Sequence, residues 1–373
     1  MLQIDHIYEF LYQSLFNDFQ FWHLPNGVVK SNPVDIQDIS VFTPEPKPDL
    51  KIFFYDQEPL VPTLSKFYID LFKDRIRSTS ILVTSEYSAE VSQLVDFEKL
   101  YYFFHGFAAL DWYRGHYALN YNKSIVKDYK YDYIAYNRII DNDRSYRIYF
   151  VSLLKEQGLL DRGLVSFGVT DSLFDDWRDE VASPNTKLSD LARRHAEQHL
   201  TDISRLVIDQ AELPGSASAD IPRGNDAFWH VVTETVFYYD KLHLTEKIFK
   251  PIVSKQPFML LAAPGNLAYL KSYGFKTFDS VLDESYDFIQ DPDQRTEAII
   301  CQLHWYCGLS NKDKTDVMRA IEPIVLHNFH HFYSEFKHII TRELLDNTKT
   351  LFRDIGYDDS HINYNDIYHT LTY

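Results

Sequence analysis

Disulfide frameworks and membrane-spanning runs are both missing from this 373-residue sequence. Only two cysteines are present, Cys301 and Cys307, so no set of disulfides holds the fold and a reducing compartment is expected. No stretch reaches the roughly 18 uninterrupted apolar residues of a membrane span. The opening MLQIDHIYEF carries acids where a signal peptide needs a basic segment followed by an apolar one. These absences predict a soluble, cytoplasmic protein with no membrane partner.

Positive charge is also scarce. The chain has 37 Lys and Arg against 54 Asp and Glu, a formal net charge of -17 at pH 7. Such a surface repels nucleic acid as a whole, which counts against a simple DNA-binding module but not against an enzyme that grips DNA in one local groove. Hydrophobic residues make up 45% of the chain, enough to fill two ordinary cores at this length.

Short apolar runs that end abruptly in polar residues alternate with segments of helical spacing. The expected strands lie at residues 50–56, 80–86, 101–106, 128–139, 164–168, 228–232 and 257–263. The expected helices lie at residues 1–24, 64–72, 89–94, 144–158, 188–199, 244–256, 293–309 and 314–345. This alternation predicts an α/β fold with parallel sheets. We expect two Rossmann-like domains facing a cleft, at residues 1–125 and 126–350, followed by a C-terminal tail at 351–373.

Residues 228–278 hold the order strand, loop, helix, strand, which is half of a dinucleotide-type fold. Thr245 is suited to be the N-cap of the helix, and Glu246 and Lys247 fall in its first turn. In open parallel sheets, such a helix N-terminus presents free N–H groups to phosphates. An ammonium there suits a pyrophosphate, and a carboxylate can accept both hydroxyls of a ribose. From spacing alone, a solvated Glu-Lys pair on a helix surface is the preferred interpretation.

A second polar cluster follows the expected strand at 128–139. Asn137, Arg138, Arg144 and Arg147 occur within a few residues of its end. Arginine makes bidentate contacts to phosphate oxygens, so this group is a candidate phosphate site. A network of surface salt bridges explains the same residues equally well.

Carboxylates also end the first strong strand, in the sequence DQEP at residues 56–59. Glu58 is placed where a general base would be, although an ordinary turn with solvated acids fits the same sequence. Asp56 and Gln57 beside it, with His105 and Trp112 after the strand at 101–106, are the candidate acceptor-binding residues. An indole could stack on a sugar or a base, and ordinary packing is the alternative for His105 and Trp112.

Two further patterns contain residues of metal-ligand type, but we expect no metal ion at either. Asp141 and Asp143 form an Asp-x-Asp triplet of a kind that can bind a metal ion, but the triplet precedes a helix and capping is preferred. His327, His331 and Glu335 share one helical face. Their aromatic neighbours favour a packed or solvated helix there.

Taken together, these motifs resemble the donor-binding region of the alpha-fucosyltransferases. That family has a strand ending in Phe-Glu-Asn, a short loop, then Thr-Glu-Lys, a helix and an apolar strand before Gly. Here Glu234 and then Thr245, Glu246 and Lys247 occupy those places, with a slightly longer loop and no Asn, and the resemblance implies that all four belong to the donor-binding site. The resemblance implies that Glu246 holds the nucleotide ribose and Lys247 the diphosphate. Because the Asn is missing, it does not specify the sugar.

Two further elements of the same family have counterparts. FFYDQEP is similar to an apolar strand ending in Asn-Phe-Glu-Ser-Pro, which implies that Glu58 is the base that deprotonates the acceptor hydroxyl. IAYNRIIDNDRSYR is similar to a strand ending in Ser-Asn with a phosphate-binding arginine downstream. That arginine is Arg138 or Arg147, with Asn137 beside it. The implied architecture is GT-B, with two Rossmann-like domains.

A closer overall likeness is to phage-encoded glycosyltransferase-like proteins that combine DQEP, YNR with later arginines, GLVSFG, TEK and GFKTFD. The resemblance implies transfer of a hexose or pentose from a nucleotide-diphosphate sugar, inverting and without metal or other cofactor. The acceptor would be a hydroxymethylated pyrimidine of phage DNA, in the host cytoplasm. The alternatives are a glycan-directed fucosyltransferase-like enzyme and a non-catalytic nucleotide-binding structural protein.

Overall fold

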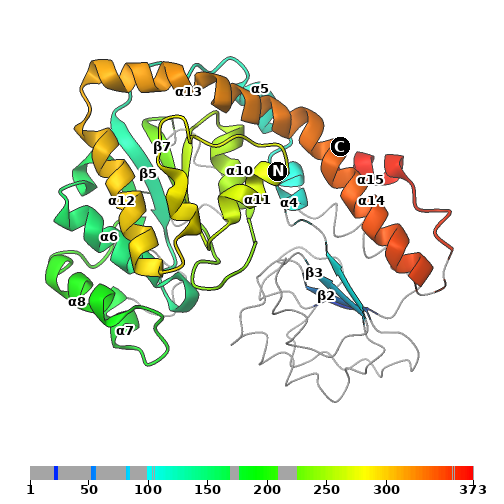
Figure 1. Ribbon diagram of the computed structural model, residues 1–373, viewed down its shortest axis with the longest axis horizontal. Coiled ribbons are helices and arrows are strands. Elements are labelled where there is room, and N and C mark those ends of the chain that lie inside the picture. Colours follow the sequence, from blue (N-terminus) through cyan, green and yellow to red (C-terminus); the bar gives the residue numbers. More distant parts are fainter. Residues whose placement is uncertain are drawn as a thin grey trace. The chain divides into compact units, whose positions relative to one another are not determined.

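The computed structural model divides into two compact units (Figure 1), one of Met1–Arg114 with Ser334–Tyr373 and one of Gly115–Tyr333. The residues that the structure describes are 21–23, 52–55, 81–84, 99–102, 104, 106–168, 176–208, 225–354, 356 and 358–372. The sequence-based boundaries at 125/126 and 350/351 differ from these divisions. The last part of the helical region belongs to the first unit together with the tail.

The first unit contains a four-stranded parallel sheet in the order β1-β2-β3-β4. Its strands are β1 (Phe21–His23), β2 (Ile52–Tyr55), β3 (Ile81–Thr84) and β4 (Lys99–Tyr102). The strands expected at 50–56 and 80–86 are confirmed, and that expected at 101–106 lies a few residues earlier. The helix expected at 1–24 is wrong at its end, because Phe21 pairs with Ile52 in the sheet. Pairing with a strand far along the chain makes this segment a strand. The local helical periodicity of its sequence does not reveal that pairing.

Helices from both ends of the chain complete the first unit. They are α4 (Phe107–Trp112), α14 (Lys337–Asp354) and α15 (Tyr364–Thr372). The Phe104 amide donates to Glu343 Oε1 at 2.9 Å, and the Phe104 and Phe336 rings meet edge to face at 6.0 Å. Asn347 on α14 donates to the Tyr102 carbonyl. These contacts join the end of β4 to a helix more than 230 residues later in the chain.

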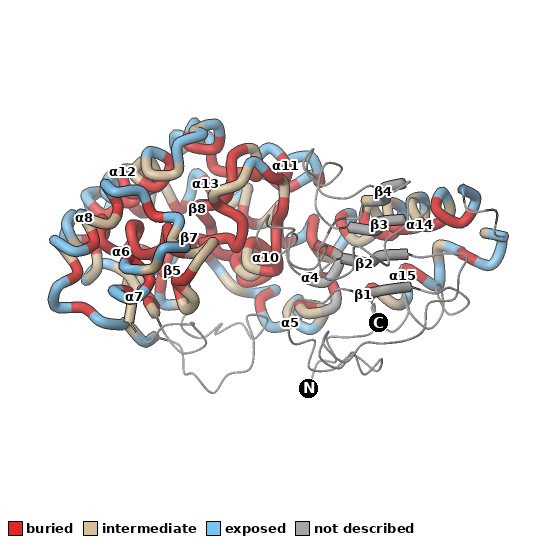
Figure 2. Tube along the Cα trace, turned by 90° about the horizontal axis from the view of Figure 1, so that it is seen from below, coloured by how far each residue is buried: buried red, intermediate tan, exposed pale blue. Residues whose placement is uncertain are grey.

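The second unit is built on another parallel sheet, in the order β6-β5-β7-β8. Its strands are β5 (Tyr131–Asn137), β6 (Gly163–Phe167), β7 (Ala227–Thr233) and β8 (Phe258–Leu261). They confirm the four strands expected in this half. Every residue of β7 is buried (Figure 2), which is why its sequence is a continuous apolar run rather than an alternating one.

The longer helices around this sheet, among the described residues, are α6 (Tyr146–Glu156), α8 (Asp190–His199), α10 (Glu246–Val253), α12 (Pro292–Gly308) and α13 (Asn311–His331). Helix α6 packs against α8 and α12, and α10 packs against α13. Figure 1 shows α6, α8 and α12 on one side of β5 and β7, with α10 on the other. Aromatic rings pack together in the core, for example Trp229 against Phe278 at 5.4 Å.

The helix expected at 314–345 is interrupted. After α13 the chain forms a π-helical segment, η5 (Phe332–Phe336), before α14 begins. The division between the two units falls inside this segment, between Tyr333 and Ser334. Sequence periodicity identified the helical character but not the interruption, because a π turn shifts the register without a characteristic residue.

Candidate functional site

The order of the second sheet creates a topological switch point. The connection from β5 to β6 and the connection from β7 to β8 move outward in opposite directions, and β5 and β7 are hydrogen-bonded neighbours. In open α/β sheets, ligands bind outside the carboxyl ends of the two strands that flank such a point. Those ends are Asn137 in β5 and Thr233 in β7. The polar clusters expected from the sequence in this half of the chain follow these two ends.

Glu234, the first residue after β7, fixes the loop that leads to α10. Its side chain is fully buried. Oε1 accepts from the Thr245 amide at 3.2 Å, and Oε2 accepts from Thr245 Oγ1 at 2.6 Å and from the Thr235 amide at 3.3 Å. Burial raises the pKa of Glu234, while the nearby Lys247 and the Thr245 donors oppose that shift. The carboxyl group therefore braces the start of α10 at the end of β7.

Lys247 lies over the N-terminus of α10. Thr245 is the N-cap, and its Oγ1 accepts from the Lys247 amide at 3.4 Å. The Lys247 ammonium donates to Thr235 Oγ1 at 3.2 Å and to Thr245 Oγ1 at 3.1 Å, and it pairs with Glu246 Oε1 at 3.1 Å. The Glu246 side chain is only 6% exposed and that of Lys247 is 28% exposed. The pair is therefore not a freely solvated surface ion pair, because the Glu246 carboxylate is almost fully buried at the N-terminus of α10.

Arg147, in the first turn of α6, spans the switch point. Its Nη1 donates to the Ile139 carbonyl at 2.8 Å, and its Nη2 donates to the carbonyls of Thr233 and Glu234 at 2.7 and 3.5 Å. The Tyr146 hydroxyl donates to the same Glu234 carbonyl at 2.6 Å. Burial lowers the pKa of Arg147. The guanidinium joins the segment after β5 to the end of β7, and its two Nη atoms face main-chain oxygens.

Asn137 ends β5 and is fully buried. Its amide nitrogen donates to Ser166 Oγ at 3.0 Å. Within the described part of the chain, neither Oδ1 nor Nδ2 of its side chain has a hydrogen-bond partner. A buried polar group left without a partner costs about 1–3 kcal/mol, so a polar ligand or water that satisfies this amide is favoured. Arg138 follows directly and is half-buried, as is Arg144 in η2 (Asn142–Arg144).

Several expected residues belong to the first unit. Asp56, Gln57, Glu58 and His105 lie outside the residues that the structure describes. The expected helices at 64–72 and 89–94 lie outside them as well. Trp112 ends α4 and is half-buried, and its Nε1 has no hydrogen-bond partner among the described residues. The roles of these residues stay predictions.

The structure also describes the two candidate metal-binding patterns, at Asp141 and Asp143 and at His327 and His331. Asp141 precedes η2, but its side chain makes no capping hydrogen bond, so the expected capping role is wrong for that side chain. Asp143 Oδ1 instead accepts from the Tyr239 hydroxyl at 2.7 Å. His327 and His331 contact main-chain oxygens through Nε2, at 3.0 Å from Gly274 O and 2.7 Å from Tyr273 O. The packed alternative is confirmed for these two histidines.

One polar cluster was not anticipated from the sequence. Glu156, the last residue of α6, lies beside His195 and His199 of α8. The spacing of the two histidines, four residues apart on one helix, was the available signal. Their partner Glu156 comes from a separate helix, and only the packing of α6 on α8 brings it near.

The fold and the switch point define the class, an α/β protein with parallel four-stranded sheets whose order is compatible with Rossmann-like folds. No family model, no curated protein and no solved structure matches the chain. In the described part of the chain, no helix is both long enough and apolar enough to cross a membrane.

Proposed function

We propose that the carboxyl edge of the second sheet binds the nucleoside-diphosphate part of an activated sugar, and that the protein is a glycosyltransferase. The observation that carries the proposal is that three features follow the two neighbouring strand ends at one switch point. They are the Lys247 ammonium, the N-terminus of α10 and the unsatisfied side-chain amide of Asn137. Positive charge and free donors at such an edge suit a diphosphate. The sequence motifs add the resemblance to glycosyltransferases.

Each residue at the edge then has a role. Lys247 and Arg138 bind the diphosphate, Glu246 accepts the ribose hydroxyls, and Asn137 bonds the donor through its amide. We assign the phosphate-binding role to Arg138 because it directly follows Asn137 at the carboxyl end of β5, whereas the guanidinium of Arg147 joins the carbonyls of Ile139 and Thr233. Arg147, together with Glu234 and Thr245, positions the strand ends and the start of α10.

The transfer is a single displacement. Lys247, Arg138 and the dipole of α10 neutralise the leaving diphosphate as its bond to the anomeric carbon breaks. The acceptor hydroxyl attacks that carbon from the opposite face and passes its proton to Glu58, the base implied by the resemblance, so the configuration inverts. We propose a hydroxymethylated pyrimidine of phage DNA as the acceptor. A chain with a net charge of -17 then needs a local basic groove to hold it.

A thermal-shift screen with GDP-, UDP-, CMP- and dTDP-sugars tests donor binding. A donor at about 100 times its Kd stabilises the folded state by about 2.7 kcal/mol, so the melting temperature rises with concentration. We expect one class to give this shift in the wild type and Lys247→Ala to give about half of it or less at the same donor concentration. The matched control is Lys312→Ala, since Lys312 on α13 is an 82%-exposed lysine. Equal shifts in the Lys247→Ala and wild-type proteins would remove the proposed site.

Glu58→Gln separates the enzyme from the alternative of a non-catalytic nucleotide-binding protein. The variant is expected to bind the donor normally and to lose transfer about 100- to 10,000-fold, the usual contribution of a general base. Transfer is measured as release of the nucleoside diphosphate in the presence of hydroxymethylated DNA. Full activity in the variant contradicts the assignment of Glu58. Donor binding without transfer by the wild type to DNA or glycan acceptors favours the non-catalytic alternative.

A further inference from the structure

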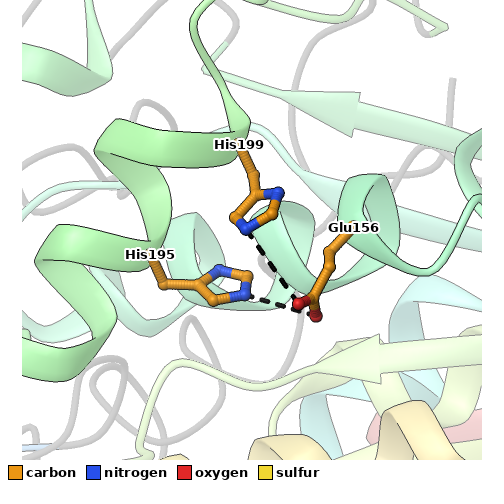
Figure 3. Close-up of side chains that lie close together, drawn as sticks. All are labelled: Glu156, His195 and His199. Carbon is orange, nitrogen blue, oxygen red and sulfur yellow. Dashed lines mark ion pairs between the residues drawn. The ribbon is translucent and has the colours of Figure 1, made fainter.

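The unanticipated cluster lies where the last turn of α6 meets α8 (Figure 3). His195 Nε2 approaches Glu156 Oε2 to 3.3 Å, and His199 Nε2 approaches Glu156 Oε1 to 4.0 Å. The two imidazoles stack with their centroids 4.4 Å apart. One potential ligand atom from each of the three residues lies within 4.8 Å of the others. Three donor atoms of metal-binding type thus converge on one small volume.

The hydrogen bonds of Ser152 favour the tautomer of His195 that carries its proton on Nδ1. Ser152 Oγ donates its single hydrogen to the Tyr149 carbonyl at 2.8 Å, so it can only accept from His195 Nδ1, also at 2.8 Å. The ring proton is therefore on Nδ1, and Nε2 presents a lone pair. This Nε2 atom is buried and makes no hydrogen bond within the described residues.

A lone pair on His195 Nε2 that faces the carboxylate of Glu156 is unfavourable unless a cation lies between them. A second proton on the imidazole would supply positive charge, at the cost of placing a charged ring in a mostly buried position. A metal ion supplies the charge without this cost. It also uses the neutral imidazole and the ionised carboxylate as they stand.

We propose that Glu156, His195 and His199 bind a divalent transition-metal ion of the zinc type. Metal–ligand bonds of about 2.0–2.2 Å in tetrahedral geometry separate the ligand atoms by roughly 3.3–3.6 Å. The two histidines approach different oxygens of Glu156, and one ligand atom from each residue lies within 4.8 Å of the others, so the side chains must move together by roughly 1 Å to reach that range. Imidazole ligands select zinc, cobalt or nickel over magnesium and calcium. Ser152 then serves as the outer partner that orients His195.

The three ligands leave one coordination position open. The cluster borders a surface cavity of about 570 Å³, formed by residues of α6, α8 and α12. Its apolar wall includes Leu153 and Ile300, and Glu297 and His304 also line it. A site with three protein ligands and an accessible fourth position is typical of a zinc ion that holds water or an exchangeable ligand. The fourth ligand is therefore a water or a small molecule seated in this cavity.

Cobalt titration of the metal-free, tag-free full-length protein tests the site. Tetrahedral Co²⁺ absorbs in the visible region, and we expect one equivalent per chain, displaced by Zn²⁺ but not by millimolar Mg²⁺. Glu156→Gln and His199→Gln should each weaken binding more than about 100-fold, and Ser152→Ala about tenfold. The control is His361→Gln, which replaces an exposed histidine far along the chain and should bind as the wild type does.

Three results overturn the proposal. The first is a wild-type protein that stays folded by circular dichroism and binds no cobalt. The second is unchanged affinity in both Glu156→Gln and His199→Gln. The third is equal competition by Mg²⁺, which is incompatible with imidazole ligands. The proposal does not depend on the glycosyltransferase assignment, because Lys247→Ala should retain the full cobalt affinity.

Discussion

Helix α6 carries a polar site at each end, and the two sites are built in opposite ways. In the first turn, the Nη donors of Arg147 meet main-chain carbonyls on both sides of the switch point. In the last turn, Glu156 faces a histidine nitrogen that has no donor to offer. Nine residues at 1.5 Å each separate the two by about 14 Å along the axis. The Nη donors of Arg147 hold main-chain segments in place, whereas the unsatisfied His195 nitrogen leaves room for a ligand.

Arg147→Met is the sharpest way to break the first site. The change leaves carbonyl oxygens of Ile139, Thr233 and Glu234 without their donor in a buried setting. We expect a loss of about 3–5 kcal/mol in the free energy of unfolding, as for other buried charged groups whose partner is removed. Urea denaturation measures it. A loss below about 1 kcal/mol would show that Arg147 does not join the two strand ends.

The next largest expected effect is the contribution of His230 to the pH dependence of the free energy of unfolding. Burial in β7 lowers the pKa of His230 to about 3, with Lys250 adding to the shift and Gln256 opposing it. Below pH 6.5, His230 binds a proton in the unfolded chain but stays neutral in the folded protein. The free energy of unfolding therefore decreases as the pH falls from 6.5 towards 3. The loss attributable to this residue is roughly 2 kcal/mol at pH 5 relative to pH 8.

The check is a set of denaturation curves at pH 8 and pH 5 for the wild type and for His230→Gln. The variant should lose less stability than the wild type on acidification. An identical loss in both would mean that His230 is charged in the folded state or already neutral in the unfolded one. The same comparison for His195 should give a smaller difference, because its side chain is 15% exposed.

Glu156→Gln predicts the smallest effect on folding and completes the contrast with Arg147. In metal-free protein, an amide nitrogen can donate to the lone pair of His195 that the carboxylate only opposes. We expect the free energy of unfolding to stay within about 0.5 kcal/mol of the wild type, as at most surface positions. The same urea series provides the measurement. A loss comparable to that of Arg147→Met would show that Glu156 is part of the structural frame.

The sequence predicted the sheets well because their strands are apolar runs with sharp polar ends. The run at β7 and the Thr245 cap are local signals, and both are found where they were expected. Phe21–His23 was misjudged because its strand partner lies some 30 residues away. The helical interruption at η5 has no local signature.

The candidate site was predictable to the extent that it depends on strand ends. Carboxyl ends of parallel strands meet at one edge, so Asn137 and Lys247 could be expected to lie near each other before any coordinates. Which of these polar side chains are buried could not be predicted from the sequence in the same way. Glu234 was expected to bind the donor, and the structure shows its carboxyl group bonded to Thr245 and Thr235 inside the protein. The Glu156 cluster needed the packing of two helices, which no local pattern encodes.

Titration calorimetry with the nucleotide-sugar that gives the largest thermal shift tests the central claim most directly. The wild type should bind one equivalent, and Lys247→Ala should bind at least about tenfold more weakly, the value of a charged hydrogen bond to phosphate. Lys312→Ala should match the wild type. If none of the four donor classes binds, or if Lys247→Ala binds as tightly as the wild type, the switch-point edge is not a nucleotide-sugar site.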